Sequence, residues 1–151
     1  MVLDKKVIEA RLRKLDRSIA KLKRFSQITR KDYLANEDYQ ELVERNFQVA
    51  IQTCIDIANY LIAQENLPVP DEEENIFLTL SRVRILPKKL SEKIKGMIGF
   101  RNILVHEYLG IDHTLVYGLL QNRLSDFTDF AKAIVTFIEK EIGRASCRER
   151  V

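Results

Sequence analysis

The sequence is poor in the residues that cross-link small secreted proteins or interrupt helices. Among 151 residues there are two cysteines, three prolines, five glycines and no tryptophan. Two cysteines, one of them in the last nine residues, cannot build the disulfide framework of a small secreted domain. Few prolines and glycines leave few turn signals, which favours long helices with short connections. No apolar run approaches the about 20 residues that a membrane-spanning helix needs, so we expect a cytoplasmic protein.

The last nine residues, "GRASCRERV" (143–151), do not follow the pattern of the rest of the chain. Their apolar periodicity is lost after Gly143, and we interpret them as a vector-derived or disordered tail behind a single domain, residues 1–142. Residues 144–151 hold three arginines and one glutamate, so subtracting +2 from the chain's net charge of +3 leaves +1 for the domain. Charge alone is therefore weak evidence for nucleic-acid binding. Without the tail only Cys54 remains, and its helical spacing from Phe47, Ala50 and Ile51 predicts a core position.

Apolar residues recur at steps of three and four along most of the chain, which is typical of amphipathic helices. The pattern predicts helices over residues 3–25, 38–65, 74–84, 88–108 and about 112–142, with a further helical turn at 29–36. The acidic run 71–74 is expected to stabilise a helix start. Gly110 is expected to end one helix, and Asp112 or Thr114 to cap the next. Strand-like alternation is absent, so the sequence predicts an all-α, up-and-down bundle of four to five helices.

One helix carries a feature that packing alone does not explain. In "GFRNILVHEY" (99–108), Arg101 lies at the centre of the stripe formed by Leu90, Ile94, Met97, Ile98, Leu104 and Val105. An unpaired guanidinium is costly to bury, which leaves two explanations. Either Arg101 forms an ion pair with a carboxylate of another helix, or the stripe faces a dimer cleft where a cation holds an anion.

The residues next to Arg101 favour phosphate chemistry. Arginine binds phosphate through two parallel hydrogen bonds, and Asn102 adds a polar amide beside it. His106 titrates near neutral pH and can move a proton at an attacking 2′-hydroxyl or a leaving oxygen, a route that needs no metal or cofactor. On an ideal helix Arg101 and His106 point about 140° apart. To act on one phosphate, either the long Arg101 side chain wraps round the helix, the helix loosens before Gly110, or the two side chains act across a two-fold interface. We favour the third explanation, which implies a homodimer.

Basic residues are dense just before this motif. Residues 82–101 hold seven lysines and arginines and one acid, Glu92. Such a run is either an ordinary solvated face or, beside a cleft, a track for an RNA backbone. The second interpretation makes the following residues candidates for RNA binding: Arg82, Arg84, Lys88 and Lys95.

At these residues the chain resembles the HEPN superfamily, and most closely its HepT branch. Arg101, Asn102, His106 and Tyr108 fill every position of the R-x-x-x-x-H-x-Y motif, and the helix order is similar over about residues 3–142. The resemblance implies a HEPN-like fold and a metal-independent endoribonuclease that acts as a homodimer. It implies catalytic roles for Arg101 and His106, with Asn102 assisting.

The same resemblance implies how such an activity is controlled. HepT proteins are toxins of type VII toxin–antitoxin systems, and their antitoxin is a minimal, MntA-like nucleotidyltransferase. That partner adds AMP to the tyrosine of the motif, which here is Tyr108. Tyr108 lies about 20° from Arg101 by helical position, so a phosphate-bearing adduct there would occupy or repel the place of the substrate.

Two other functions fit the sequence. The chain could be a non-catalytic helical partner that holds a substrate for the nucleotidyltransferase. It could also be a structural dimerisation bundle in which Arg101 is only ion-paired. Loss of a toxic effect on replacing Arg101 or His106 would separate the ribonuclease from both.

Overall fold

The computed structural model describes residues 4–106 and 110–149, with residues 145–149 described by their backbone alone. All regular secondary structure among the described residues is helical, and no strand occurs among them. The elements are α1 (Lys5–Phe25), α2 (Arg30–Ala35), α3 (Glu37–Gln64), the 3-10 helix η1 (Glu73–Asn75), α4 (Ile76–Arg82), α5 (Lys88–Val105), α6 (His113–Asn122) and α7 (Leu124–Glu149).

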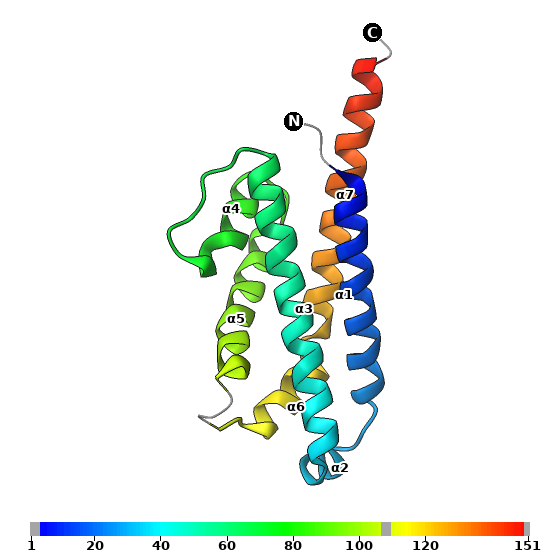
Figure 1. Ribbon diagram of the computed structural model, residues 1–151, viewed down its shortest axis with the longest axis vertical. Helices are drawn as coiled ribbons and strands as arrows, with labels where there is room; N and C mark the ends of the chain where they lie inside the picture. The colour runs from blue at the N-terminus through cyan, green and yellow to red at the C-terminus, as the bar shows by residue number, and fades with distance from the viewer. Residues whose placement is uncertain (1–3, 107–109, 150–151) are drawn as a thin grey trace.

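Four long helices form the body of the molecule (Figure 1). Helix α1 packs against α3 and α7, and α5 packs against α3, α4 and α7. The short helices α2 and α6 lie together at one end of the bundle, and η1 packs on α5. This arrangement confirms the all-α prediction, although the described chain has seven α-helices where four to five were expected.

The helix starts follow the capping residues of the sequence. Asp4, Thr29 and Asn36 cap α1, α2 and α3 by accepting a backbone N–H with the side chain. Of the two predicted caps for α6, Asp112 is the one used: its Oδ1 accepts the N–H groups of Thr114 and Leu115, each at 3.1 Å. Gly110, in the link before it, has a φ of 87°, a conformation that favours glycine.

The last part of the chain differs from the prediction in two ways. The helix expected at about 112–142 is broken at Arg123, whose φ of −120° and ψ of 5° leave the helical range. The break is stabilised because Arg123 Nε donates to Asp126 Oδ2 at 2.7 Å and Nη2 to the carbonyl of Lys93 on α5 at 3.3 Å. Helix α7 also continues through Gly143 to Glu149, because a single glycine costs a helix only about 1 kcal/mol.

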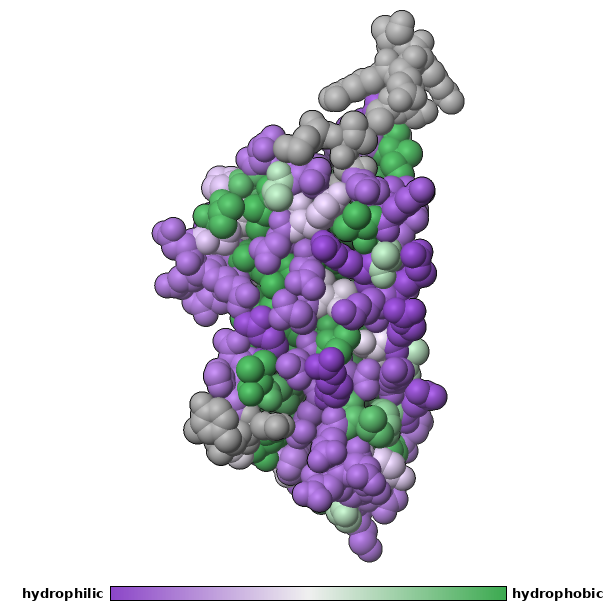
Figure 2. Space-filling model, in the orientation of Figure 1, coloured by the Kyte–Doolittle hydropathy of each residue, from purple (hydrophilic) through white to green (hydrophobic). Residues whose placement is uncertain are grey.

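The core is built from the apolar stripes of all the long helices. Phe47 of α3 lies at its centre, with its ring 5.4 Å from that of Phe100 and 6.2 Å from that of Phe127. Cys54 is fully buried, as predicted, and burial raises the pKa of its thiol. The face seen in Figure 2 is mainly hydrophilic, with apolar side chains in small separate patches. None of the described helices has the length and apolar character needed to cross a bilayer.

Candidate active site around Arg101

Arg101 lies where the sequence places it, at the centre of the buried face of α5. The buried residues of this helix surround its position: Leu90, Ser91, Ile94, Met97, Ile98, Phe100 and Leu104. Only 13% of the Arg101 side chain is exposed. Val105, expected in the same stripe, is instead half exposed, because it is the last residue of the helix.

Three acceptors hold the guanidinium of Arg101. Nη1 donates to Oε1 of Gln52 on α3 at 2.9 Å, and Nη2 donates to Oε1 of Glu73 in η1 at 2.5 Å. Nε and Nη2 both donate to Oδ1 of Asn102, at 3.2 and 2.8 Å. The ion pair with a carboxylate of another element, one of the two explanations left open by the sequence, is therefore present.

The ion pair is not sealed in the core. The side chain of Glu73 is 47% exposed, so solvent reaches the carboxylate that neutralises Arg101. Glu73 comes from the acidic run 71–74, which was expected only to support a helix start. Its position in the first turn of η1, packed on α5, brings it to Arg101 as well.

Arg101 also lines a cavity of about 280 Å³ between α1, α3 and α5. The lining consists of basic, amide and apolar side chains: Lys14, Arg45, Gln48, Val49, Gln52, Arg101, Asn102 and Val105. Three cations thus face one cavity, and the described residues that line it include no carboxylate. Sequence reasoning missed Lys14 and Arg45. The signal for Lys14 was the basic outer face of the first helix, which resembles any solvated face, and no pattern in the sequence singled out Arg45.

His106 faces a different hollow. It is the C-cap residue of α5, and its side chain is exposed. Its backbone N–H donates to the backbone carbonyl of Asn102 at 3.1 Å. It lines a second pocket with Asn102, Ile103, Gly110, Asp112 and Leu115. Asn102 lies between the two cavities and lines both. The angle that the sequence predicts between Arg101 and His106 thus corresponds to two adjacent cavities. The tyrosine of the motif, Tyr108, lies outside the described residues.

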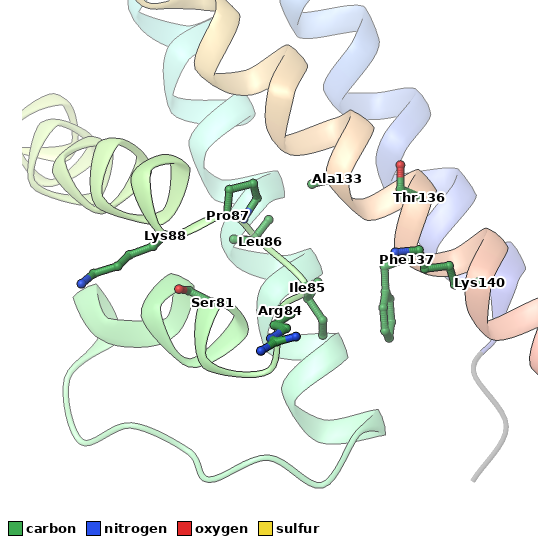
Figure 3. A pocket seen from close by; sticks show the side chains of 10 residues that line it. All are labelled: Ser81, Arg84, Ile85, Leu86, Pro87, Lys88, Ala133, Thr136, Phe137 and Lys140. Atoms are coloured by element: carbon green, nitrogen blue, oxygen red, sulfur yellow. The ribbon is translucent and has the colours of Figure 1, made fainter.

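The other predicted RNA-binding residues are not brought to Arg101. Arg82, Arg84 and Lys88 are exposed and Lys95 is partly buried, and none of the four lines the Arg101 cavity. Arg84 and Lys88 line a separate pocket between the α4–α5 turn and α7, together with Lys140 and Phe137 (Figure 3). Lys88 is thirteen residues before Arg101 in the same helix, about 20 Å along its axis. Within the described part of the chain, no group of three or more His, Cys, Asp or Glu side chains is placed to hold a metal ion.

Comparison with known proteins identifies the family. The family model described as ribonuclease HepT-like matches residues 15–134, a range that includes the whole of α5 and the motif. The chain belongs to this family. Membership confirms the resemblance seen at the motif and the prediction of a ribonuclease, an enzyme that cleaves RNA.

Individual relatives of this HepT-like chain agree with the family model. It is 32% identical to the mRNA nuclease HepT of Shewanella oneidensis over 75% of this chain and 86% of that protein. It is 30% identical to the tRNA nuclease HepT of Aphanizomenon flos-aquae over 87% and 90% of the two chains. A solved structure of the tri-AMPylated Shewanella oneidensis HEPN toxin with its MNT antitoxin superimposes with a TM-score of 0.81 at 27% identity, covering 89% of this chain and 99% of that one.

Proposed function

We propose that this chain is the toxin of a type VII toxin–antitoxin pair, a metal-independent endoribonuclease that acts as a homodimer. The observation that carries the proposal is the arrangement at Asn102. On one side a nearly buried, oriented guanidinium faces a basic cavity, and on the other lies the cavity of His106. The names of the relatives support RNA as the substrate, and the structure with an MNT antitoxin supports a nucleotidyltransferase partner.

In this proposal each motif residue has a defined role. Arg101 binds the scissile phosphate and stabilises the negative charge that builds on it. His106 accepts the proton of the 2′-hydroxyl as the 2′-oxygen forms a bond to phosphorus, and the bond from phosphorus to the 5′-oxygen breaks. The leaving 5′-oxygen takes up a proton from solvent water, and His106 later releases its proton to solvent. Asn102 assists by fixing Arg101, whose Nε and Nη2 it holds through Oδ1.

The homodimer follows from the separation of the two catalytic side chains. Within one chain Arg101 and His106 line different cavities, which supports a site where the two side chains act on one phosphate from different subunits. A two-fold axis beside α5 would place Arg101 of one subunit next to the His106 cavity of the other. Each dimer would then contain two composite sites.

Control by the antitoxin acts on Tyr108. The nucleotidyltransferase transfers AMP from ATP to the tyrosine hydroxyl, forming a bond between the tyrosine oxygen and the α-phosphorus and releasing pyrophosphate. The adduct places a negatively charged phosphate seven residues from Arg101 in the sequence. It would compete with RNA for the basic residues and repel the RNA backbone.

Expression of the chain without its antitoxin tests the nuclease. We expect growth arrest with the natural sequence and normal growth with Arg101→Ala or His106→Ala, while the purified protein cleaves RNA in the presence of a chelator. Harmless expression of the natural sequence, with no cleavage in vitro, would contradict the proposal and favour a non-catalytic partner of the nucleotidyltransferase.

Co-expression with the neighbouring nucleotidyltransferase tests the control mechanism. Intact-mass measurement should show one or more added AMP groups, and the Tyr108→Phe variant should show none. An unmodified mass in the presence of an active nucleotidyltransferase would contradict regulation at Tyr108.

A further inference from the structure

The cavity beside Arg101 is lined by one continuous face of α3. Gln48 and Val49 lie three and four residues after Arg45, and Gln52 lies four and three residues after them, so the four side chains form a single row along the helix. The row ends at Gln52, which holds the Arg101 guanidinium at 2.9 Å. Lys14 of α1 closes the other side of the cavity.

The charges of this cavity are arranged for an anion. Lys14, Arg45 and Arg101 converge on it, and like charges that converge on one hollow raise the local potential. Arg101 is neutralised by Glu73, but among the residues that the structure describes neither Lys14 nor Arg45 forms an ion pair. These two cations are thus available to a ligand.

Arg11, a neighbouring basic residue of α1, has a structural role. Arg11 donates to the carbonyl of Asp56 on α3 at 3.3 Å, and its guanidinium lies 5.4 Å from the centre of the Tyr60 ring. Arg11 thus fastens α1 to α3. Lys14, one turn later, is exposed at the cavity instead.

We propose that Lys14 and Arg45 form a binding subsite for a backbone phosphate of the RNA, next to the phosphate held by Arg101. This inference rests on the proposed function and extends it to residues outside the motif. The ligand is an RNA phosphodiester because the cavity combines cations for the phosphate with the amides of Gln48 and Asn102, which can hydrogen-bond ribose hydroxyls and base edges. The subsite fixes the strand so that the next phosphate meets Arg101.

Binding is tested apart from cleavage by using the full chain with His106→Ala and a fluorescein-labelled single-stranded RNA. The Lys14→Gln/Arg45→Gln double variant should bind the RNA roughly tenfold more weakly at low salt. Each phosphate contact on a single strand contributes about 0.7 to the slope of log affinity against log salt. Because the two cations hold one phosphate, we expect the slope to fall by about 0.7, which fluorescence anisotropy at several salt concentrations measures.

The matched control is Arg30→Gln/Lys31→Gln, which removes the same charge from exposed positions of α2 that do not line the cavity. Both double variants should unfold at the temperature of the parent protein, because all four side chains are exposed. Equal RNA affinity and salt slope in the two double variants would overturn the subsite, as would an absence of RNA binding by the parent.

The proposed nuclease activity is tested separately, by measuring RNA cleavage with the protein that retains His106. If that chain does not cut RNA while binding still depends on Lys14 and Arg45, the proposed nuclease activity fails and the subsite stands. If the chain cuts RNA while the Lys14 and Arg45 double variant binds like the control, the subsite fails and the nuclease stands.

Discussion

At the scale of single residues, Glu73 determines which edge of the Arg101 guanidinium is open to a ligand. Its carboxylate occupies one edge of the guanidinium that a phosphate would use, and it is half exposed. Because water reaches this carboxylate, the ion pair contributes on the order of 1 kcal/mol to stability. We therefore expect a phosphate to displace Glu73 from Arg101 without disturbing the fold.

Replacing Glu73 by glutamine tests this competition. Glu73→Gln keeps a hydrogen-bond acceptor for Arg101 but removes the charge that competes with phosphate. RNA affinity in the His106→Ala background should rise about two- to fivefold, as measured by fluorescence anisotropy. Glu74→Gln, which removes the adjacent exposed acid, should change affinity less. Weaker binding by Glu73→Gln than by Glu74→Gln would contradict the account.

The sequence could predict the place of Arg101 but not its partners. Helical periodicity alone puts Arg101 at the centre of a buried stripe, because the angle between residues of one helix is fixed. Gln52 and Glu73 lie 49 and 28 positions away, so their contacts with Arg101 depend on how α3 and η1 pack on α5. The same holds for Lys14 and Arg45.

At the scale of elements, the junction of α6 and α7 is fixed by Arg123. Asp126 is almost fully buried, and Arg123 supplies its ion pair while also bonding the carbonyl of Lys93. Periodicity could not predict this break, because the apolar pattern continues across it and one of the bonds that stabilise it reaches α5.

Removing Arg123 should therefore destabilise the protein measurably. Arg123→Leu leaves the buried carboxylate of Asp126 without its cation, and we expect the free energy of unfolding to fall by about 1–3 kcal/mol. Urea denaturation measures this difference. The control is Arg144→Leu, whose exposed ion pair with Glu141 should matter little. Equal stability of the two variants would show that the junction does not depend on Arg123.

Glu65, at the end of α3, should make the stability of the bundle depend on pH. Burial, and then repulsion by Glu141, raise the pKa of its carboxyl above the ordinary value of 4.5. The folded state thus favours the protonated form, so this group favours folding below pH 4.5 and ceases to do so as the pH rises through its raised pKa.

Glu65→Gln removes this titration. The variant should have a higher Tm than the natural sequence at pH 7, and the difference should shrink as the pH falls below 4.5. Thermal unfolding followed by circular dichroism at both pH values measures it. A Tm difference that is the same at pH 7 and pH 4 would contradict the assignment to Glu65.

At the scale of the whole molecule, one bundle presents the two proposed catalytic side chains, Arg101 and His106, at two separate cavities. The all-α architecture and the HepT-like family could be predicted from the sequence; the structure confirms the first and the family model confirms the second. The division of Arg101 and His106 between two cavities agrees with their angle on an ideal helix. In the proposed homodimer, the Arg101 cavity of one subunit meets the His106 cavity of the other.

Mixing two inactive variants tests this central claim most directly. Arg101→Ala and His106→Ala are each purified, mixed in equal amounts, allowed to exchange subunits, and assayed for RNA cleavage. In a composite site, Arg101 from one subunit meets His106 from the other, so half of the dimers are mixed and each has one intact site. The account predicts recovery of about a quarter of the activity of the natural protein. An active natural protein whose two variants stay inactive after exchange would contradict it.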